Sequence, residues 1–564
     1  YAGTGASALA YTSAVTGFDD AYRPLGAEVT IPRAGGFADT YRTHTTYHVN
    51  GAVATTTMPA AGGLTEETIT PGYDAVGTPI TLTGTDTYLA DTTFYPWGPA
   101  YQQILGTGAR RVRVTTTLDE ATGRLTTASA DTEQPTTPGT WRQQLTTDYR
   151  YDPAGSVRAI TETTDAGASV TSECFTYDGL RQLTEAWTTT ASTCQTTPTQ
   201  GVVGGPQAYW TSFTYTPLGL RDTETRHSTG VSTVRDYVYP DPGEPRPHTL
   251  AGITTTGTGT SLDSYTYDAT GNTTTRTVAG RPDQTLTWDP EGHLATVTDQ
   301  AGTTSYLYDA DGNRLQATDP TGTTTYLGDT EIRQPVSGAT VCTRFYAGLA
   351  VRTSTTGLAW QINDHHGTGQ LTITATDQTV THRRMDPFGN PRGPQTWPTT
   401  RGYLNGQADA SGLTHLGARE YDPGIGRFIS VDPLLVTTDP QQFNGYTYAN
   451  NDPATTSDPT GMAPECGGGT GNYQCSNDVP VASSAQGTVG PGHDGSSWNG
   501  GYNTNGVKSR KPLTTDGSGK RPTTKQDYAC QKYGACTTRP AKPDSYSFGS
   551  TTGPDNPCGG AETA

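Results

Sequence analysis

Three consecutive stretches decide the fold expected for this chain: YTYDATGNTTTRT (residues 265–277), LTWDPEGHLATVT (286–298) and YLYDADGNRLQAT (306–318). They begin about twenty residues apart and follow one unit, aromatic-x-aromatic-Asp-x-x-Gly-x-Leu-x-x-x-Thr. Other clear copies begin at Tyr149, Phe175 and Phe213, and weaker ones at Gly72 and Phe94. Such self-similarity indicates an architecture built from repeated units.

Each position of the unit has a physical role. Alternating aromatic residues lie on one face of a strand, because side chains alternate with period two. The Asp accepts hydrogen bonds from the turn backbone, and the Gly adopts the positive φ that closes a hairpin. One hairpin cannot bury its aromatic face alone, so neighbouring hairpins must join into a continuous sheet. We therefore expect these Tyr and Asp residues to build scaffold rather than to catalyse.

The composition agrees with strands joined by tight turns. Hydrophobic residues make up 32% of the 564 residues and charged residues 16%, while Thr, Gly and Tyr are abundant. A disordered Gly/Pro/Thr-rich stalk is the alternative, but such stalks lack regularly placed Tyr, Leu and Trp. The formal net charge of −18 argues against nucleic acid as the main partner. No apolar run approaches the roughly 20 residues that span a bilayer.

Two stretches near the end of the repeats are more specific than the repeats themselves. They read DHHGTGQLTITATDQTVTHRRMDPFGNPRG (364–393) and GLTHLGAREYDPGIGRFISVDP (412–433), and DPTGM (458–462) follows them. Together with the repeats they resemble the YD/Rhs-repeat family of actinobacterial type, over roughly residues 10–462. The family includes polymorphic toxin carriers and is related to the shell of Tc toxin C components and to teneurins.

The resemblance implies an all-β fold, in which a spiral YD-repeat sheet forms a hollow shell, or cocoon, closed by an Rhs repeat-associated core. We expect the shell over residues 1–400 and the core, acting as a plug, over 401–462. A variable C-terminal region, the cargo, is expected over 463–564. Tyr1 is not an initiator residue and the first residues read like mid-repeat sequence, so we expect a fragment or a processed product.

The resemblance also implies self-cleavage by an aspartyl-type pair of carboxylates. The expected pair is Asp432 and Asp458, with Arg427 assisting and the cut between Met462 and Ala463. Asp452 is a rival for the second carboxylate. Many family members have Arg-Asp-Pro-x-Gly at the first position, where this chain reads Val-Asp-Pro-Leu-Leu (431–435). The alternative is that these Asp-Pro steps only initiate turns.

The cysteines and histidines point to a disulfide rather than to a metal. Cys174 and Cys194 flank a polar loop, and we expect them to be bonded in an oxidising compartment; two unpaired buried thiols are the alternative. No CxxC pair is present, which argues against a zinc ribbon. His365 and His366 are adjacent and would point to opposite faces of a strand. We expect no metal and no cofactor.

The last hundred residues differ sharply from the repeats. Residues 463–564 contain six members of the Val, Leu, Ile, Met and Phe set, too few to offset the ordering entropy of such a segment. Three alternatives remain: a disulfide scaffold, a chain held unfolded inside the shell, or an incomplete toxin. The segment carries no recognisable toxin motif, since it has one histidine and no zinc-deaminase signature.

Two functions compete at this stage. The first is a secreted or cell-surface toxin carrier of interbacterial competition, whose shell encloses and delivers its own C-terminal region, with a cognate immunity protein as a further partner. The second is a structural or adhesive surface protein that binds glycans or neighbouring cells and releases no cargo. The end of the core at DPTGM, with unrelated sequence beyond, favours the carrier.

Overall fold

The computed structural model describes residues 11–32, 38–195, 197–241, 243–434 and 440–466. Within these ranges nearly all regular structure is antiparallel β-strand, and no helix is long and apolar enough to cross a membrane. The helices are short 3-10 turns: η1 (Asp165–Gly167), η2 (Tyr403–Asn405), η3 (Pro440–Phe443) and η4 (Ala449–Asn451). The all-β expectation is confirmed. The C-terminal region from residue 467 onward, with four of its cysteines, lies outside the described residues.

The first sheet has seven strands in chain order. They are β1 (Thr12–Phe18), β2 (Pro24–Pro32), β3 (Ala38–Tyr47), β4 (Val53–Met58), β5 (Glu67–Tyr73), β6 (Pro79–Thr83) and β7 (Thr87–Leu89).

The following strands, β8 to β32, form one closed sheet, which we call the shell. Each strand pairs antiparallel with its neighbour in sequence along the run from β8 to β32. The strands are β8 (Asp91–Phe94), β9 (Ala100–Leu105), β10 (Val112–Leu118), β11 (Leu125–Glu133), β12 (Trp141–Tyr151), β13 (Val157–Thr164), β14 (Ser169–Tyr177), β15 (Leu183–Thr189), β16 (Trp210–Tyr215), β17 (Arg221–Arg226), β18 (Thr233–Val238), β19 (Gly252–Thr256), β20 (Thr260–Tyr267), β21 (Thr273–Thr277), β22 (Gln284–Trp288), β23 (Leu294–Asp299), β24 (Gly302–Tyr308), β25 (Arg314–Asp319), β26 (Gly322–Leu327), β27 (Thr330–Pro335), β28 (Val341–Tyr346), β29 (Ala350–Thr353), β30 (Gly357–Asn363), β31 (Gly369–Thr374) and β32 (Val380–His382).

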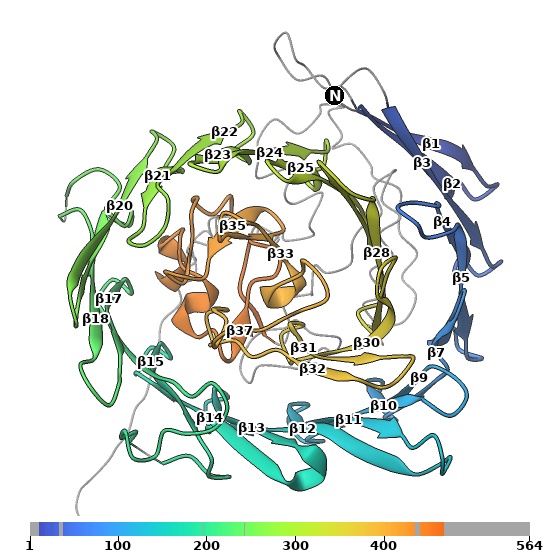
Figure 1. Ribbon diagram of the computed structural model, residues 1–564, viewed down its shortest axis with the longest axis horizontal. Helices are drawn as coiled ribbons and strands as arrows, with labels where there is room; N and C mark the ends of the chain where they lie inside the picture. Colours follow the sequence, from blue (N-terminus) through green and yellow to red (C-terminus); the bar gives the residue numbers. More distant parts are fainter. Residues whose placement is uncertain (1–10, 33–37, 196, 242, 435–439, 467–564) are drawn as a thin grey trace, which may run out of the picture. The chain divides into compact units, whose positions relative to one another are not determined.

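The first sheet and the end of the shell lie against each other as two layers. Figure 1 shows β5 and β7 outside β28 and β30. Apolar residues of the early strands, such as Tyr88 and Leu105, share one buried cluster with Tyr346 and Trp360 of the later strands. The rings of Tyr88 and Tyr346 are stacked with centroids 3.7 Å apart. The first sheet therefore packs outside the last strands of the shell, as in the spiral that the family resemblance implies.

The repeat unit forms its hairpin as its chemistry predicts. In the turn after β20, Asp268 Oδ1 accepts hydrogen bonds from the backbone N–H groups of Thr270 and Asn272, both at 2.9 Å. Gly271 has a φ of +92°. The second aromatic residue of the unit also forms a hydrogen bond. The Tyr267 hydroxyl donates to the carbonyl of Leu250 at 3.0 Å. Tyr308 binds Leu294 in the same way. These tyrosines tie each hairpin to the preceding one.

The expected core segment, residues 401–462, forms one small sheet and, together with residues 465 and 466, a second. The first holds β33 (Gln407–Ala408), β34 (Thr414–Leu416), β35 (Arg419–Asp422) and β36 (Arg427–Phe428), and the second holds β37 (Thr456–Ser457) and β38 (Glu465–Cys466). Figure 1 shows these strands inside the ring of shell strands. Tyr421, Phe428 and Tyr448 of this segment are buried in one cluster with Phe175 and Phe213 of the shell.

Buried shell arginines bind the core segment. Arg276 Nη2 lies 2.6 Å from Asp422 Oδ2, and neither side chain is more than 4% exposed. Arg314, with no exposed side-chain surface, pairs with Asp409 at 2.9 Å and with Glu420 at 2.8 Å. Because a buried charge is stable only when it is paired, each of these contacts depends on both partners. The shell and the core segment are thus joined by ion pairs as well as by aromatic packing.

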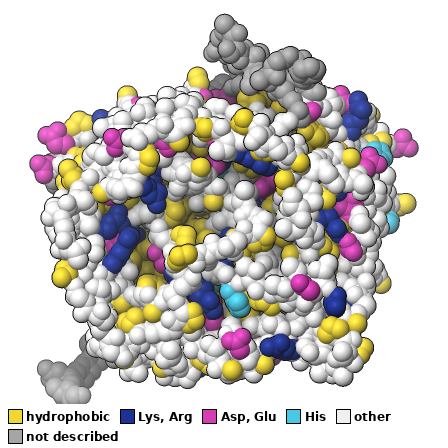
Figure 2. All heavy atoms as spheres, in the orientation of Figure 1, with side chains coloured by type: hydrophobic (Ala, Val, Ile, Leu, Met, Phe, Trp, Pro, Cys, Tyr) yellow, Lys and Arg dark blue, Asp and Glu magenta, His cyan; other side chains and the backbone are white. Residues whose placement is uncertain are grey.

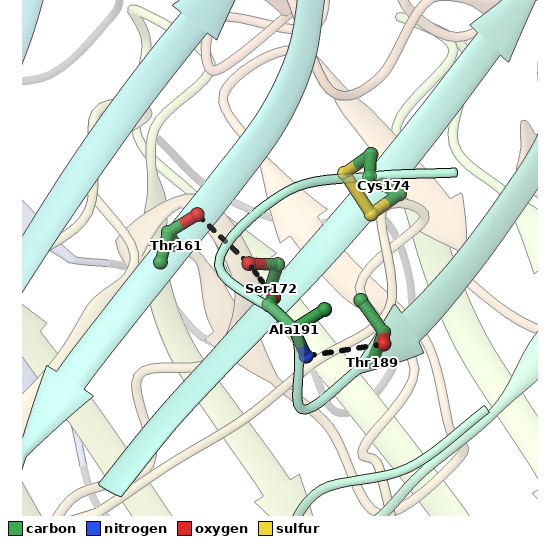
Figure 3. Close-up of a disulfide and its surroundings, with 6 residues drawn as sticks. Thr161, Ser172, Cys174, Thr189 and Ala191 are labelled. Atoms are coloured by element: carbon green, nitrogen blue, oxygen red, sulfur yellow. Dashed lines mark hydrogen bonds between the residues drawn. A yellow bond between two sulfur atoms is a disulfide. The ribbon is translucent and has the colours of Figure 1, made fainter. Parts of the chain in front are cut away.

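Cys174 and Cys194 are joined by a disulfide with a sequence separation of 20 (Figure 3). The loop that it closes also receives hydrogen bonds: Ser172 Oγ donates to the Ala191 carbonyl at 2.7 Å, and the Ala191 N–H donates to Thr189 Oγ1 at 3.2 Å. Among the cysteines whose side chains the structure describes, Cys342 is free and buried.

On the face shown in Figure 2, basic and acidic side chains are interspersed between uncharged ones. This view has no large basic patch of the kind that binds nucleic acid.

Candidate functional site

The bond between Met462 and Ala463 lies in a short reversal of the chain. Thr456 and Ser457 of β37 pair with residues 466 and 465 of β38, so the segment between them folds back. Inside it, Asp458 Oδ1 accepts hydrogen bonds from the backbone N–H of Met462 at 3.0 Å and of Ala463 at 3.2 Å. Asp458 is 1% exposed. A buried carboxylate therefore contacts the amide nitrogen of the expected cleavage site.

The second expected carboxylate lies next to the first. Arg419 Nη2 is 2.9 Å from Asp432 Oδ2 and also 2.9 Å from Asp458 Oδ2. Asp432 is held in place by its own backbone, because its N–H donates to the Gly445 carbonyl at 2.9 Å and its Oδ1 accepts the Leu434 N–H at 2.8 Å. The two carboxylates therefore lie close together, both in contact with one guanidinium nitrogen.

Arg419, which the sequence analysis did not select, is fixed from several sides. It begins β35, and its guanidinium stacks on the Phe428 ring at 3.6 Å. Its Nη1 donates to the Gly445 carbonyl at 3.0 Å, and its Nε donates to the Gly461 carbonyl. The same side chain thus binds both carboxylates and the backbone one residue before Met462.

The pKa of Asp432 is raised to about 6, chiefly by burial, while the positive charge of Arg419 opposes the rise and the negative charge of Asp458 adds to it. Asp458 accepts two backbone N–H groups and an arginine N–H.

The contacts of Arg427, for which an assisting role is expected, are with other groups than this pair. It begins β36 and is paired in register with Asp422 of β35. Its guanidinium donates to the Tyr239 hydroxyl at 2.9 Å and to the His248 carbonyl at 2.5 Å. Arg427 therefore joins the core segment to the shell, and Arg419 occupies the place that was expected for it.

Asp452, the rival for the second carboxylate, lies in a different environment. It is 5% exposed, and burial raises its pKa to about 7, while a hydrogen bond from Thr455 opposes the rise. Thr455 in turn accepts the Val157 N–H at 3.0 Å, at the joint between the core segment and β13. The geometry thus favours Asp458 over Asp452.

His365 and His366 lie in the turn between β30 and β31, not on a strand as the sequence analysis assumed. Asp364 Oδ1 closes this turn by accepting the His366 N–H at 2.9 Å, and the two rings lie 3.8 Å apart. Turn geometry therefore brings together two side chains that strand geometry would separate. His365 Nε2 lies 2.8 Å from the Ala454 carbonyl, and burial lowers the pKa of both histidines.

One group of three side chains in the described ranges has donor atoms within 4.8 Å of one another: Asp289, Glu291 and His293. These residues belong to one repeat turn, in which Asp289 Oδ1 already accepts the N–H groups of Glu291 and His293 at 2.9 Å. The hydrogen bonds of the repeat turn therefore account for the short distances among these three side chains.

Known proteins match the chain in sequence and in fold. The RHS Repeat family model matches residues 288–324. The tRNA(Glu)-specific nuclease WapA of Bacillus subtilis subsp. natto (strain BEST195) is 35% identical over 102 residues, which cover 17% of this chain and 4% of that protein.

Solved Tc toxin structures share the fold. A crystal structure of TcdB2-TccC3 matches 80% of this chain with a TM-score of 0.56 and 20% identity. A Photorhabdus luminescens Tc holotoxin pore with a mutated TccC3 matches 81% with a TM-score of 0.58 and 19% identity. This chain spans 24% and 23% of those chains, respectively. The repeat units and the family match over residues 288–324 identify an Rhs/YD-repeat protein, and the Tc toxin structures share its fold.

Proposed function

We propose that this chain is the shell-forming part of a secreted toxin carrier, and that its core segment cuts the chain once, between Met462 and Ala463. The observation that carries the self-cleavage is the contact of Asp458 with the Ala463 nitrogen, together with Arg419 shared by Asp458 and Asp432. The carrier function is supported by the family and by the fold shared with a Tc toxin component.

In this proposal the two carboxylates have different roles. The Asp458 carboxylate accepts a proton from a water molecule as the water oxygen attacks the Met462 carbonyl carbon. Asp432, protonated near pH 6, donates a hydrogen bond to the carbonyl oxygen, which becomes negative in the transition state. Asp458 then delivers its proton to the Ala463 nitrogen 3.2 Å away, and the C–N bond breaks.

Products of this hydrolysis are a carboxylate on Met462 and an amine on Ala463. The reaction is intramolecular, so the position of the segment replaces substrate binding and even a slow catalyst completes its single turnover. Arg419 contacts both side chains and so keeps them together.

In this proposal the released C-terminal region is the cargo and stays enclosed until delivery. A cognate immunity protein would protect the producing cell, and cell-surface glycans are candidate receptors on the target cell. Secretion agrees with the disulfide between Cys174 and Cys194, since such bonds persist in oxidising compartments.

Intact-mass analysis of the purified full chain tests the self-cleavage. We expect two fragments, residues 1–462 and 463–564, that co-purify in the wild type, and one uncut chain in the Asp458→Asn variant. Limited proteolysis then tests enclosure: the 463–564 fragment should resist digestion in the native complex and be digested after denaturation. An uncut wild-type chain whose tail is digested freely would instead favour the adhesive surface protein.

A further inference from the structure

The turn from Leu416 to Arg419, between β34 and β35, lies against the backbone that precedes the proposed cleavage site. Gly417 in this turn has a φ of +53°. A β-carbon added there would lie 2.3 Å from the Thr460 carbonyl oxygen and 2.8 Å from its carbonyl carbon. Both contacts are with backbone, which cannot move aside as a flexible side chain can. Glycine at this position therefore permits the close approach of two chain segments.

The approach is reciprocal. Gly461 has a φ of +65°, and a β-carbon there would lie 2.3 Å from the Leu416 carbonyl oxygen and 2.9 Å from the Arg419 nitrogen. Each segment thus presents a glycine to the backbone of the other, and no side chain separates them.

Hydrogen bonds connect this contact to the reacting groups. The Ala418 N–H donates to the Thr460 carbonyl at 2.9 Å, and Arg419 Nε donates to the Gly461 carbonyl. The next peptide units, at Met462 and Ala463, donate to Asp458 Oδ1. Residues 417–419 of the turn therefore hold the Thr460–Gly461 backbone in place. The N–H groups that follow this backbone, at Met462 and Ala463, contact Asp458.

We infer that Gly417 is a positioning residue for the self-cleavage: its bare α-carbon lets the turn bind the Thr460–Gly461 backbone and hold the Met462–Ala463 bond against Asp458. This inference rests on the proposed function. Gly417 touches neither carboxylate, so its effect passes through the position of the segment. A displacement of about 1 Å suffices to slow a reaction by roughly 100-fold.

Two substitutions separate close approach from backbone strain. Gly417→Ala adds a β-carbon and also strains a positive φ, whereas Gly417→Asn adds the β-carbon at a conformation that asparagine tolerates. Gly123→Ala is the matched control, because Gly123 has a φ of +69° and nothing within 4 Å of an added β-carbon.

The rate of appearance of the 463–564 fragment is followed by intact mass after cell-free synthesis of each full chain. We expect Gly417→Ala and Gly417→Asn both to be cut roughly 100-fold more slowly than the wild type, and Gly123→Ala to be cut at the wild-type rate. The pH profile of the slowed variants should keep the wild-type midpoint, because Asp432 and Arg419 are unchanged. A Gly417→Asn chain cut at the wild-type rate would overturn the inference.

Hydrogen exchange tests the same contact without cleavage. In the Asp432→Asn chain, which should remain intact, the Met462 and Ala463 amides should exchange slowly, and adding Gly417→Ala should make them exchange faster. Equal exchange in both chains would contradict the positioning role. If the wild type is never cut but exchange behaves as expected, the proposed self-cleavage fails. The role of Gly417 in holding the Met462–Ala463 bond against Asp458 then still stands.

Discussion

Asp458 Oδ1 lies 3.2 Å from the backbone nitrogen of Ala463, so a buried carboxylate contacts the leaving atom of the proposed cleavage. The same carboxylate shares Arg419 with Asp432, so two carboxylates contact one guanidinium nitrogen.

Removing either carboxylate should stop the cut. Asp432→Asn and Asp458→Asn keep the size of the side chain but remove the ionisable group, so we expect cleavage to slow by about 10²- to 10⁴-fold. Asp452→Asn, in the same segment but outside the pair, should be cut like the wild type. The fraction cut after purification, read by intact mass, checks all three, and loss of cleavage in Asp452→Asn alone would reverse the assignment.

Arg419, not Arg427, should be the arginine required for cleavage. Arg419→Lys keeps a charge but cannot bind both carboxylates and the Gly461 carbonyl at once, so we expect little or no cut product. Arg427→Lys should be cut normally in whatever fraction folds, because that side chain contacts Tyr239 and the His248 carbonyl instead. Fragment mass after size-exclusion isolation of the folded protein compares the two, and normal cutting by Arg419→Lys would count against the site.

The cleavage rate should fall as the pH rises above about 6. Burial raises the pKa of Asp432 from 3.8 to about 6, so its protonated form is the one favoured in the folded protein. Its contribution to stability is therefore full below pH 3.8 and is lost as the pH rises through about 6. The proton needed at the Met462 carbonyl is lost over the same range. Single-turnover rates measured between pH 5 and 8 test this, and a rate that rises across that range would exchange the roles of the two carboxylates.

The buried Arg314 should be essential for attaching the core segment. Arg314→Met leaves Asp409 and Glu420 buried without their cation, which costs about 3–5 kcal/mol. The matched control is Arg42→Met, since the Arg42 side chain is 72% exposed in its pair with Glu28 and such pairs contribute little. The denaturant concentrations at the unfolding midpoints of Arg314→Met and Arg42→Met compare their stabilities. Equal midpoints would contradict the essential role of Arg314.

Reduction of the disulfide should destabilise the shell locally. The bond between Cys174 and Cys194 closes a loop with a sequence separation of 20, for which the expected loss is about 2–4 kcal/mol. Thermal unfolding with and without reductant measures it. The Cys174→Ser/Cys194→Ser chain is the control, and it should show no response to reductant.

The hairpin repeats could be predicted from the sequence because their chemistry is local. Asp268 accepts hydrogen bonds from residues two and four positions further on, and Gly271 needs only its own φ, so a short stretch contains all the information. The winding of the sheet followed from the same repeats through the family resemblance. The choice of Asp432 and Asp458 followed from motif positions, and the structure brings these two side chains together.

By itself, then, the sequence determined the repeated hairpin, since the hairpin depends on neighbouring residues. The tertiary structure alone decided which arginine binds the carboxylates. Arg419 and Arg427 both lie in the core segment, but strand pairing sets Arg427 opposite Asp422, while the reversal after β37 carries Asp458 to Arg419. Likewise, Gly417 and Gly461 are unremarkable turn residues until the fold brings their backbones into contact. Such contacts depend on register and packing between distant segments, which no local pattern encodes.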